Sequence, residues 1–320
     1  MRINTLVMAL AMSLAAASAQ AKDLAVVASI KPIHALASAV MAGAGTPTLI
    51  VEGNASEHMY ALRPSQARAL ADADLVVWVG PMLESFLARP LSTVDATHVL
   101  TLIDLETLTR LKFRVGGPFE PEEEEHEDEH HHDDEHEHEE EGHHHHEAGS
   151  YDGHIWLDPT NAIVIAGAIA DALAVKDAEH AALYHENAKT LTARLEALDS
   201  ELASAFTPLK GKPFIVFHDA YQYLEHRYGL TTAGSVTVNP EVPASAKRIA
   251  ALKDKIVGAG AMCLFAEPQF DPKLINSLKE GTGAHAGVLD PLGADIPAGP
   301  EQYFTLMADI RAALTSCLAP

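Results

Sequence analysis

The chain has 320 residues, 48% of them hydrophobic, and a formal net charge of −23. This length and apolar content suffice for two domains with buried cores and exclude an intrinsically disordered protein. Of the 45 acidic residues, 16 lie between positions 120 and 147, a stretch without Lys or Arg; the other 29 face 22 Lys and Arg, a net charge of −7. No basic cluster is present to neutralise phosphates, so nucleic acid is not an expected partner.

The first 21 residues have the pattern of a secretory signal peptide. Arg2 precedes an apolar run from Leu6 to Ala17, and Ala-Gln-Ala at positions 19–21 predicts cleavage near Ala21. The run is shorter than the roughly 20 residues of a membrane span, and we expect no later segment to be both long and uncharged enough to replace it. No Cys near the cleavage site could carry a lipid. The sequence predicts a soluble periplasmic protein without a lipid anchor; the alternative is a short N-terminal membrane anchor.

Short apolar runs rich in β-branched residues alternate with helical patterns along the mature chain. Three runs precede the acidic stretch and three follow residue 206: positions 24–30, 48–51, 75–79, 214–218, 231–236 and 263–266. Continuous apolar strands separated by helices are typical of parallel sheets covered on both faces. The sequence therefore predicts an α/β chain with two lobes.

Residues 118–150 are predicted to form a disordered acidic loop inserted into the N-terminal lobe. The stretch has high like charge and no hydrophobic periodicity. Neutral imidazole is a good ligand for borderline metals, so the histidines of this loop are candidate auxiliary metal ligands. They are His126, His130, His131, His132, His136, His138, His143, His144, His145 and His146. The alternative is a solvated acidic face with no role in metal binding.

A long helix is predicted between the two lobes. Residues 178–206 combine good helix formers with leucines near helical spacing, at positions 183, 191, 195, 198 and 202. We therefore assign residues 22–177 to the N-terminal lobe, 178–206 to a linking helix and 207–320 to the C-terminal lobe. The alternative for this segment is an ordinary core helix of one lobe.

The mature chain contains two cysteines, Cys263 and Cys317. In an oxidising compartment, a lone pair of cysteines most simply forms one disulfide. This bond would attach the C-terminal segment to the strand predicted at 263–266. Two buried free thiols are the alternative.

Three histidines outside the acidic loop lie where an α/β fold presents ligands. His58 lies between a predicted strand and a predicted helix, His154 lies in YDGHIWLDP just after the acidic loop, and His218 ends the apolar run FIVFH. Three imidazoles suit zinc, which binds nitrogen ligands in tetrahedral geometry and takes a carboxylate or water as the fourth ligand. Glu57, beside His58, and Asp290, in LDPLG, are the candidates for that position.

Six motifs occur in one order along the chain: SEHMYALRPS, ADLVVWVG, GHIWLDP, VFHDAYQYLEHRYGL, EPQFDP and LDPLG. This set resembles the periplasmic zinc-binding proteins of high-affinity zinc-uptake ABC transporters, the ZnuA-like branch of the cluster A-I metal-binding proteins. The resemblance covers the mature chain. It implies two α/β lobes joined by one long rigid helix, with the metal site between them. It also implies capture of Zn²⁺ outside the cytoplasm and its delivery to a membrane permease.

The resemblance also implies roles for individual residues. His58, His154 and His218 match the zinc-binding histidines of these proteins, and Glu57 matches a glutamate that can complete the coordination. Asp290 corresponds to a ligand in the manganese branch, so near zinc it is either the fourth ligand or a neighbour of the ligands. The manganese and iron members have a glutamate where this chain has His218, and histidine at that position favours zinc.

The resemblance implies that Cys263 and Cys317 form the disulfide of the zinc branch. It further implies that Zn²⁺ is the transported ligand and that the main partner is the permease of a zinc ABC transporter. We expect a monomer, with other periplasmic zinc carriers as further partners. No residue marks a base that would use zinc-bound water, so we expect no enzymatic activity. The alternatives are a manganese or broad-specificity divalent-metal-binding protein and an exported zinc enzyme.

Overall fold

The computed structural model describes residues 24–114, 150–237, 246–260 and 263–319. The signal peptide predicted for residues 1–21 lies outside the described residues. The same holds for the acidic loop predicted for 118–150, apart from Ser150, and therefore for its ten histidines.

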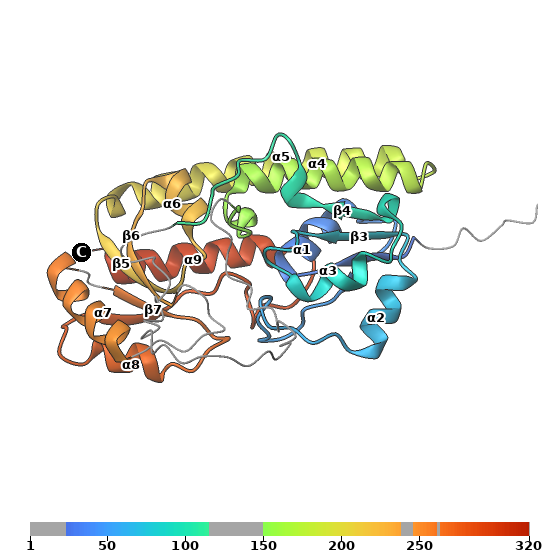
Figure 1. Ribbon diagram of the computed structural model, residues 1–320. Coiled ribbons are helices and arrows are strands. Elements are labelled where there is room, and N and C mark those ends of the chain that lie inside the picture. The colour runs from blue at the N-terminus through green and yellow to red at the C-terminus, as the bar shows by residue number, and fades with distance from the viewer. Residues whose placement is uncertain (1–23, 115–149, 238–245, 261–262, 320) are drawn as a thin grey trace, which may run out of the picture.

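The first lobe contains a parallel four-stranded sheet in the order β2-β1-β3-β4 (Figure 1). The strands are β1 (Val26–Ala28), β2 (Thr48–Leu49), β3 (Leu75–Trp78) and β4 (Val99–Thr101). Helices α1 (Lys31–Val40), α2 (Pro64–Ala71) and α3 (Ser85–Leu91) belong to the same part of the chain. Every residue of β1 and β3 is buried, as expected for central strands covered on both faces.

The second lobe contains another parallel four-stranded sheet, in the order β6-β5-β7-β8. Its strands are β5 (Pro213–His218), β6 (Thr231–Thr237), β7 (Cys263–Ala266) and β8 (His285–Val288). The helices here are α6 (Gln222–Tyr228), α7 (Ala246–Ala259) and α8 (Lys273–Lys279). The prediction of two α/β lobes with parallel sheets is confirmed, although the sequence analysis did not find β4 and β8. In each sheet the strand order reverses next to the first strand, where open α/β sheets bind ligands.

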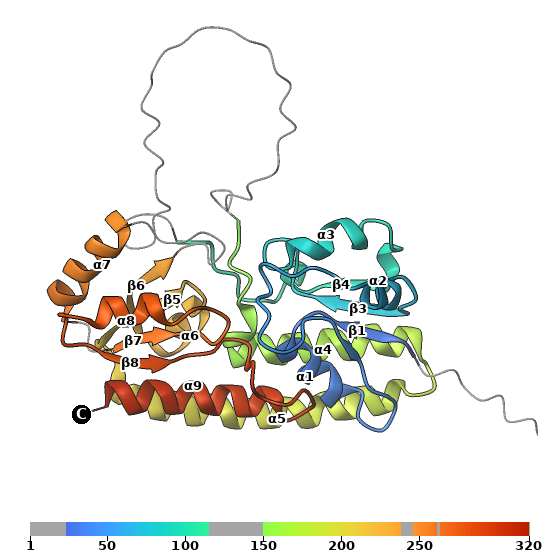
Figure 2. The ribbon, with the colours of Figure 1, turned by 90° about the horizontal axis from the view of Figure 1, so that it is seen from below.

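Two long helices connect the lobes, α5 (Ala181–Phe206) and α9 (Gln302–Leu318), and a third, α4 (Pro159–Lys176), packs against α5 and against elements of the first lobe. Helix α5 contacts α1 of the first lobe and α6 of the second, and α9 contacts α1, α5 and β8. Figure 2 shows α9 lying beside α5 along the second lobe and ending next to α1 of the first lobe. The prediction of one long helix is confirmed, and α9 is a second connection that was not predicted.

The hydrophobic core is continuous between the lobes. One cluster of buried side chains extends from β1 and β3 through α4, α5 and α9 to β5, and a smaller cluster lies within the second lobe. On α5, the buried residues recur every three or four positions, as the leucine spacing predicted. A wide separation of the lobes would expose apolar surface from this shared core, which opposes such a motion.

Helix α4 is apolar along most of its length. By length and composition it could cross a membrane, so the expectation that no segment after the signal peptide has this property is wrong. Core helices of globular domains have the same length and composition. Helix α4 packs against α5, α1 and β3, and buries residues such as Ile165, Ile169 and Leu173. We therefore interpret it as a core helix.

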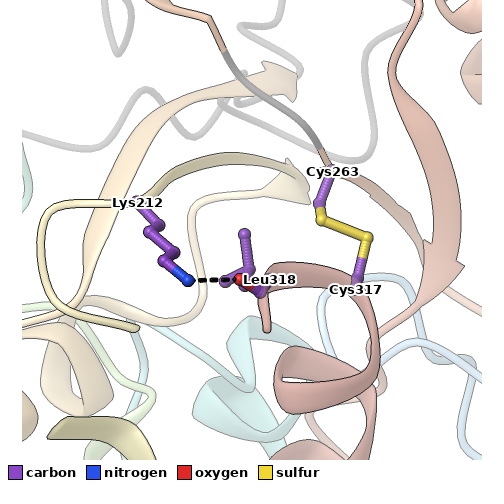
Figure 3. The surroundings of a disulfide bond; sticks show 4 residues. All are labelled: Lys212, Cys263, Cys317 and Leu318. Atoms are coloured by element: carbon purple, nitrogen blue, oxygen red, sulfur yellow. Dashed lines mark hydrogen bonds between the residues drawn. A yellow bond between two sulfur atoms is a disulfide. The ribbon is translucent and has the colours of Figure 1, made fainter. Parts of the chain in front are cut away.

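The predicted disulfide between Cys263 and Cys317 is present (Figure 3). It joins the first residue of β7 to the last turn of α9. Beside it, Lys212 Nζ donates a hydrogen bond to the carbonyl oxygen of Leu318 at 2.9 Å. The end of α9 is thus fixed to the second sheet by one covalent bond and one hydrogen bond.

Candidate metal centre

Glu57 and His58 lie on the loop between β2 and α2. Gln66 of α2 holds both ends of this loop: its Nε2 donates to the carbonyl oxygen of Ile50 at 2.8 Å, and its Oε1 accepts from the backbone N–H of Arg63 at 3.0 Å. Glu57 is buried, whereas the His58 side chain retains 11% of its exposure. The loop therefore brings a carboxylate and an imidazole from the first lobe to the interior.

His154 is oriented by Asp152. One oxygen of this carboxylate, Oδ1, accepts from the backbone N–H of His154 at 2.9 Å and lies 2.7 Å from His154 Nδ1. Between them, Gly153 packs so closely that a Cβ there would lie 2.8 Å from Leu83 Cβ. Because Nδ1 is turned to Asp152, the other ring nitrogen, Nε2, is available as a ligand.

His218 is the last residue of β5 and is oriented by Glu267. Glu267 directly follows the neighbouring strand β7, and both of its carboxylate oxygens lie 2.7 Å from His218 Nδ1. Phe270 packs near this pair, with its ring centroid 6.3 Å from that of His218 and stacked on Phe217. His218 thus repeats the arrangement of His154, with a buried carboxylate beside Nδ1 and with Nε2 as the candidate ligand atom.

The structure brings Glu57, His58, His154 and His218 together. One ligand atom from each lies within 4.8 Å of all the others. Nε2 of His154 and Nε2 of His218 are 3.2 Å apart, and Glu57 Oε1 lies 3.7 Å from His58 Nε2 and 3.8 Å from His154 Nε2. Ligand atoms about 2 Å from a tetrahedral ion are separated by roughly 3.3 Å. The four side chains therefore match the size of a zinc coordination sphere.

Burial and nearby carboxylates shift the protonation of these groups. Burial lowers the pKa of His218, but the charge and hydrogen bond of Glu267 outweigh it and raise the pKa to about 9. Burial raises the pKa of Glu57 to about 7 and that of Asp152 to about 6. A proton on His218 Nε2 can bridge to His154 Nε2 across 3.2 Å. A metal ion bound by both nitrogens would replace that proton.

Asp290 does not belong to this group of four residues. Its Oδ1 accepts from Gln269 Nε2 and from the backbone N–H of Leu292, both at 2.9 Å, and its Oδ2 accepts from the backbone N–H of Ala294 at 2.6 Å. These contacts fix the loop after β8. Of the two candidates for the fourth position, only Glu57 lies among the three histidines.

The sequence analysis did not identify Asp152 and Glu267. For Glu267 a signal existed, because it directly follows the apolar run 263–266 just as His218 ends the run 214–218. The carboxyl ends of neighbouring parallel strands meet at one edge of a sheet, so the two residues could have been paired. For Asp152, nothing in the sequence separates this carboxylate from the many others near it.

The chain is similar to known proteins over most of its length. The family described as "Zinc-uptake complex component A periplasmic" matches residues 26–317. The "High-affinity zinc uptake system protein ZnuA" of Brucella suis is 51% identical over 305 residues, which cover 92% of this chain and 91% of that protein. The protein of the same name from Paracoccus denitrificans is 43% identical over 321 residues, covering 99% and 98%.

A solved structure titled "Crystal structure of ZnuA" has the same fold. It superposes with a TM-score of 0.71 at 24% identity and covers 92% of this chain and 100% of that one. At this identity the likeness concerns the fold alone. It agrees with the two lobes and the long helices described above.

Proposed function

This chain belongs to the family of periplasmic zinc-uptake complex components, and on that basis we propose that it captures Zn²⁺ outside the cytoplasm and delivers it to the permease of an ABC transporter. The observation that carries this proposal is the group formed by Glu57, His58, His154 and His218. It combines residues of both lobes in a largely buried position, as a protein that encloses a small cargo requires. Export by cleavage near Ala21, without a lipid anchor, is part of the proposal.

We assign His58, His154 and His218 as the nitrogen ligands and Glu57 as the oxygen ligand. Three imidazoles with one carboxylate are a donor set for zinc, whereas manganese prefers mainly oxygen ligands. Asp152 and Glu267 hold the Nδ1 protons, so that the Nε2 lone pairs of their histidines face the ion. Asp290 supports the loop after β8 and is not required as a ligand.

Release requires a change around a buried ion. The shared core and the two helices α5 and α9 resist a wide opening of the lobes. On the loop with Glu57 and His58, the His58 side chain is partly exposed, so this loop is the side of the centre that solvent can reach. We infer that zinc enters and leaves past this loop, and that contact with the permease displaces the loop.

The histidines of residues 118–150 have an accessory role in this proposal. They would bind additional zinc more weakly than the four-residue centre, because a segment predicted to be disordered must be ordered on binding. We expect the protein to act as a monomer and to exchange zinc with other periplasmic carriers.

The proposal is tested by metal titration together with zinc-limited growth. Chelator competition on the mature chain should give tight binding of one zinc and weaker binding of manganese. A strain that lacks its own zinc-uptake protein should regain growth in zinc-depleted medium with this chain and not with His218→Ala. Tighter binding of manganese than of zinc would instead support the manganese alternative. Hydrolase and hydratase assays on the zinc-loaded chain test the prediction that it is not an enzyme.

A further inference from the structure

The two segments on either side of residues 115–149 pair with each other beside the metal centre. Residues 111–114 and 150–152, which we call the ladder, lie side by side between the lobes (Figure 2). Two backbone hydrogen bonds form the antiparallel bridge between Lys112 and Tyr151: the N–H of Phe113 donates to the carbonyl of Ser150 at 3.1 Å, and the N–H of Asp152 donates to the carbonyl of Leu111 at 2.8 Å. Because Asp152 ends the ladder and orients His154, the position of the ladder determines the position of this ligand.

Arg114, at the end of the first ladder segment, binds two carboxylates of the second lobe. Its Nε donates to Asp219 Oδ2 at 2.9 Å, and its Nη2 donates to Asp219 Oδ1. Its Nη1 and Nη2 donate to the two carboxylate oxygens of Glu225, both at 2.9 Å. Two bidentate contacts hold a planar guanidinium in one orientation. Since Asp219 directly follows His218, Arg114 ties the ladder to the residue next to a second ligand.

Helix α6 makes further contacts with the ladder. Gln222 Nε2 donates to the carbonyl of Lys112 at 3.1 Å and to Asp152 Oδ2 at 3.2 Å. The Tyr223 hydroxyl donates to the carbonyl of Asp152 at 2.8 Å and accepts from the N–H of Leu111 at 3.1 Å. The ladder is therefore docked on the start of α6, and Arg114 supplies the charged part of this contact.

We propose that Arg114 is a positioning residue of the metal centre: by joining the ladder to Asp219 and Glu225, it sets the separation between His154 and His218. The inference rests on the proposed function, because the centre is the one assigned above. Arg114 acts through the backbone of the ladder on one side and through Asp219 on the other. Its contribution is to fix the positions of His154 and His218 relative to each other.

The sign of the effect on zinc affinity distinguishes this role from two others. A guanidinium is always positively charged and repels Zn²⁺, so if only its charge mattered, Arg114→Ala would strengthen zinc binding. If Arg114 only stabilised the fold, the variant would unfold at lower temperature and bind zinc as the parent does. Positioning predicts weaker binding, by about 10–100-fold, the range found for groups that orient metal ligands.

The experiment compares Arg114→Ala and Arg114→Lys with a matched control on α6, the helix that Arg114 contacts through Glu225. Arg227 of α6 makes a bidentate contact with Asp199 of α5 and contacts no ligand of the centre in the hydrogen bonds described, so Arg227→Ala removes a similar ion pair elsewhere. Zinc affinity is measured on the full mature chain by chelator competition below one equivalent of zinc, and thermal unfolding is followed by circular dichroism. We expect a loss of affinity for Arg114→Ala, a smaller loss for Arg114→Lys and unchanged affinity for Arg227→Ala.

Cobalt absorption supplies a second readout that a purely structural role would not change. Co²⁺ in the centre reports ligand geometry through its visible bands, and we expect these bands to change in Arg114→Ala and not in Arg227→Ala. In a His154→Ala background, Arg114→Ala should cause little further loss of zinc affinity, because the ligand pair is already broken. Unchanged or tighter zinc binding by folded Arg114→Ala overturns the inference. If the parent itself lacks a tight site that His154→Ala weakens, the proposed function fails instead.

Discussion

The two halves of the metal centre are held in different ways. His154 and His218 each have a buried carboxylate within 2.7 Å of Nδ1, and each lies at a point that several elements fix. Glu57 and His58 lie on a loop that Gln66 secures at its ends, and His58 is partly exposed. From this difference, and on the proposed function, we infer that the first half sets the geometry of the site in advance, while the second half closes over the ion.

The largest effect should come from removing a ligand of the fixed half. His218→Ala is expected to weaken zinc binding by about two to three orders of magnitude, since one ligand of four carries about a quarter of the 10–16 kcal/mol of a structural zinc site. His58→Ala should cost about tenfold less, because water can reach the exposed side and replace the ligand. Chelator competition on both variants measures the difference. Equal losses would mean that the two halves contribute alike.

The same contrast explains which ligands could be predicted from the sequence. His218 ends an apolar run, His58 lies between a predicted strand and a predicted helix, and His154 follows the acidic loop, so these histidines could be selected from the sequence. The choice between Glu57 and Asp290 was not visible, because it depends on what else each carboxylate contacts. Asp290 is held by Gln269 and two backbone N–H groups, and only the folded chain reveals those partners.

The fold was predictable wherever burial leaves a pattern. The central strands β1, β3, β5 and β7 are apolar runs and were found, and the long helix was found from its leucine spacing. Strands β4 and β8 were missed because both lie at the edge of their sheet, where β4 is only partly buried and β8 is largely exposed. Short edge strands bury too little surface to need a distinct pattern.

A smaller effect is expected from the carboxylate that orients His218. Glu267→Gln keeps the volume of the side chain and removes its charge, and the amide can donate to Nδ1, which would leave the proton on Nε2 and block the ligand position. We expect zinc affinity to fall by about 10–100-fold. Asp177→Asn is a matched control, because the Asp177 carboxylate also lies 2.7 Å from a histidine Nδ1, that of His180, which is not part of the four-residue centre. Similar losses in both variants would argue against an orienting role for Glu267.

The protonation of the centre predicts a dependence on pH. The pKa of His218 is raised to about 9 and that of Glu57 to about 7, so zinc must displace one proton between pH 7 and 9 and two below pH 7. Affinity should therefore rise by about tenfold per pH unit between pH 7 and about 9. Competition titrations at several pH values measure this slope.

The stability of the zinc-free protein should change in the opposite direction. Folded His218 binds its proton more tightly than the unfolded residue does, which stabilises the zinc-free protein below pH 6.5. This stabilisation is lost as the pH rises through about 9. Folded Glu57 likewise keeps a proton that the unfolded residue loses near pH 4.5, so the stabilisation that it gives the zinc-free protein falls as the pH rises to about 7.

The increase in melting temperature on adding zinc should therefore be larger at about pH 9 than at about pH 6. In His218→Ala this difference should largely disappear, and a pH-independent increase in the parent would contradict the protonation scheme.

The smallest effect on the centre should come from removing the acidic, histidine-rich residues. Phe113 and Ser150 are hydrogen-bonded neighbours. A deletion of 118–149 leaves three residues, Val115, Gly116 and Gly117, to join Arg114 to Ser150, and a connection of this length suffices between paired segments. No described core residue is lost, and we expect the fold and the affinity of the tight site to be unchanged. Additional, weaker zinc equivalents should disappear, because their candidate ligands are the ten histidines of this stretch. In the undeleted protein, the affinity for these additional zinc ions should also fall as the pH falls through about 6.5, where free imidazoles protonate.

A full-length variant with the ten histidines replaced by asparagine is the matched control for the deletion, since it keeps the length and the acidic charge. If the deletion abolishes tight binding, or if the deleted and full-length proteins bind the same number of zinc ions, the separation between a fixed centre and an auxiliary segment is wrong.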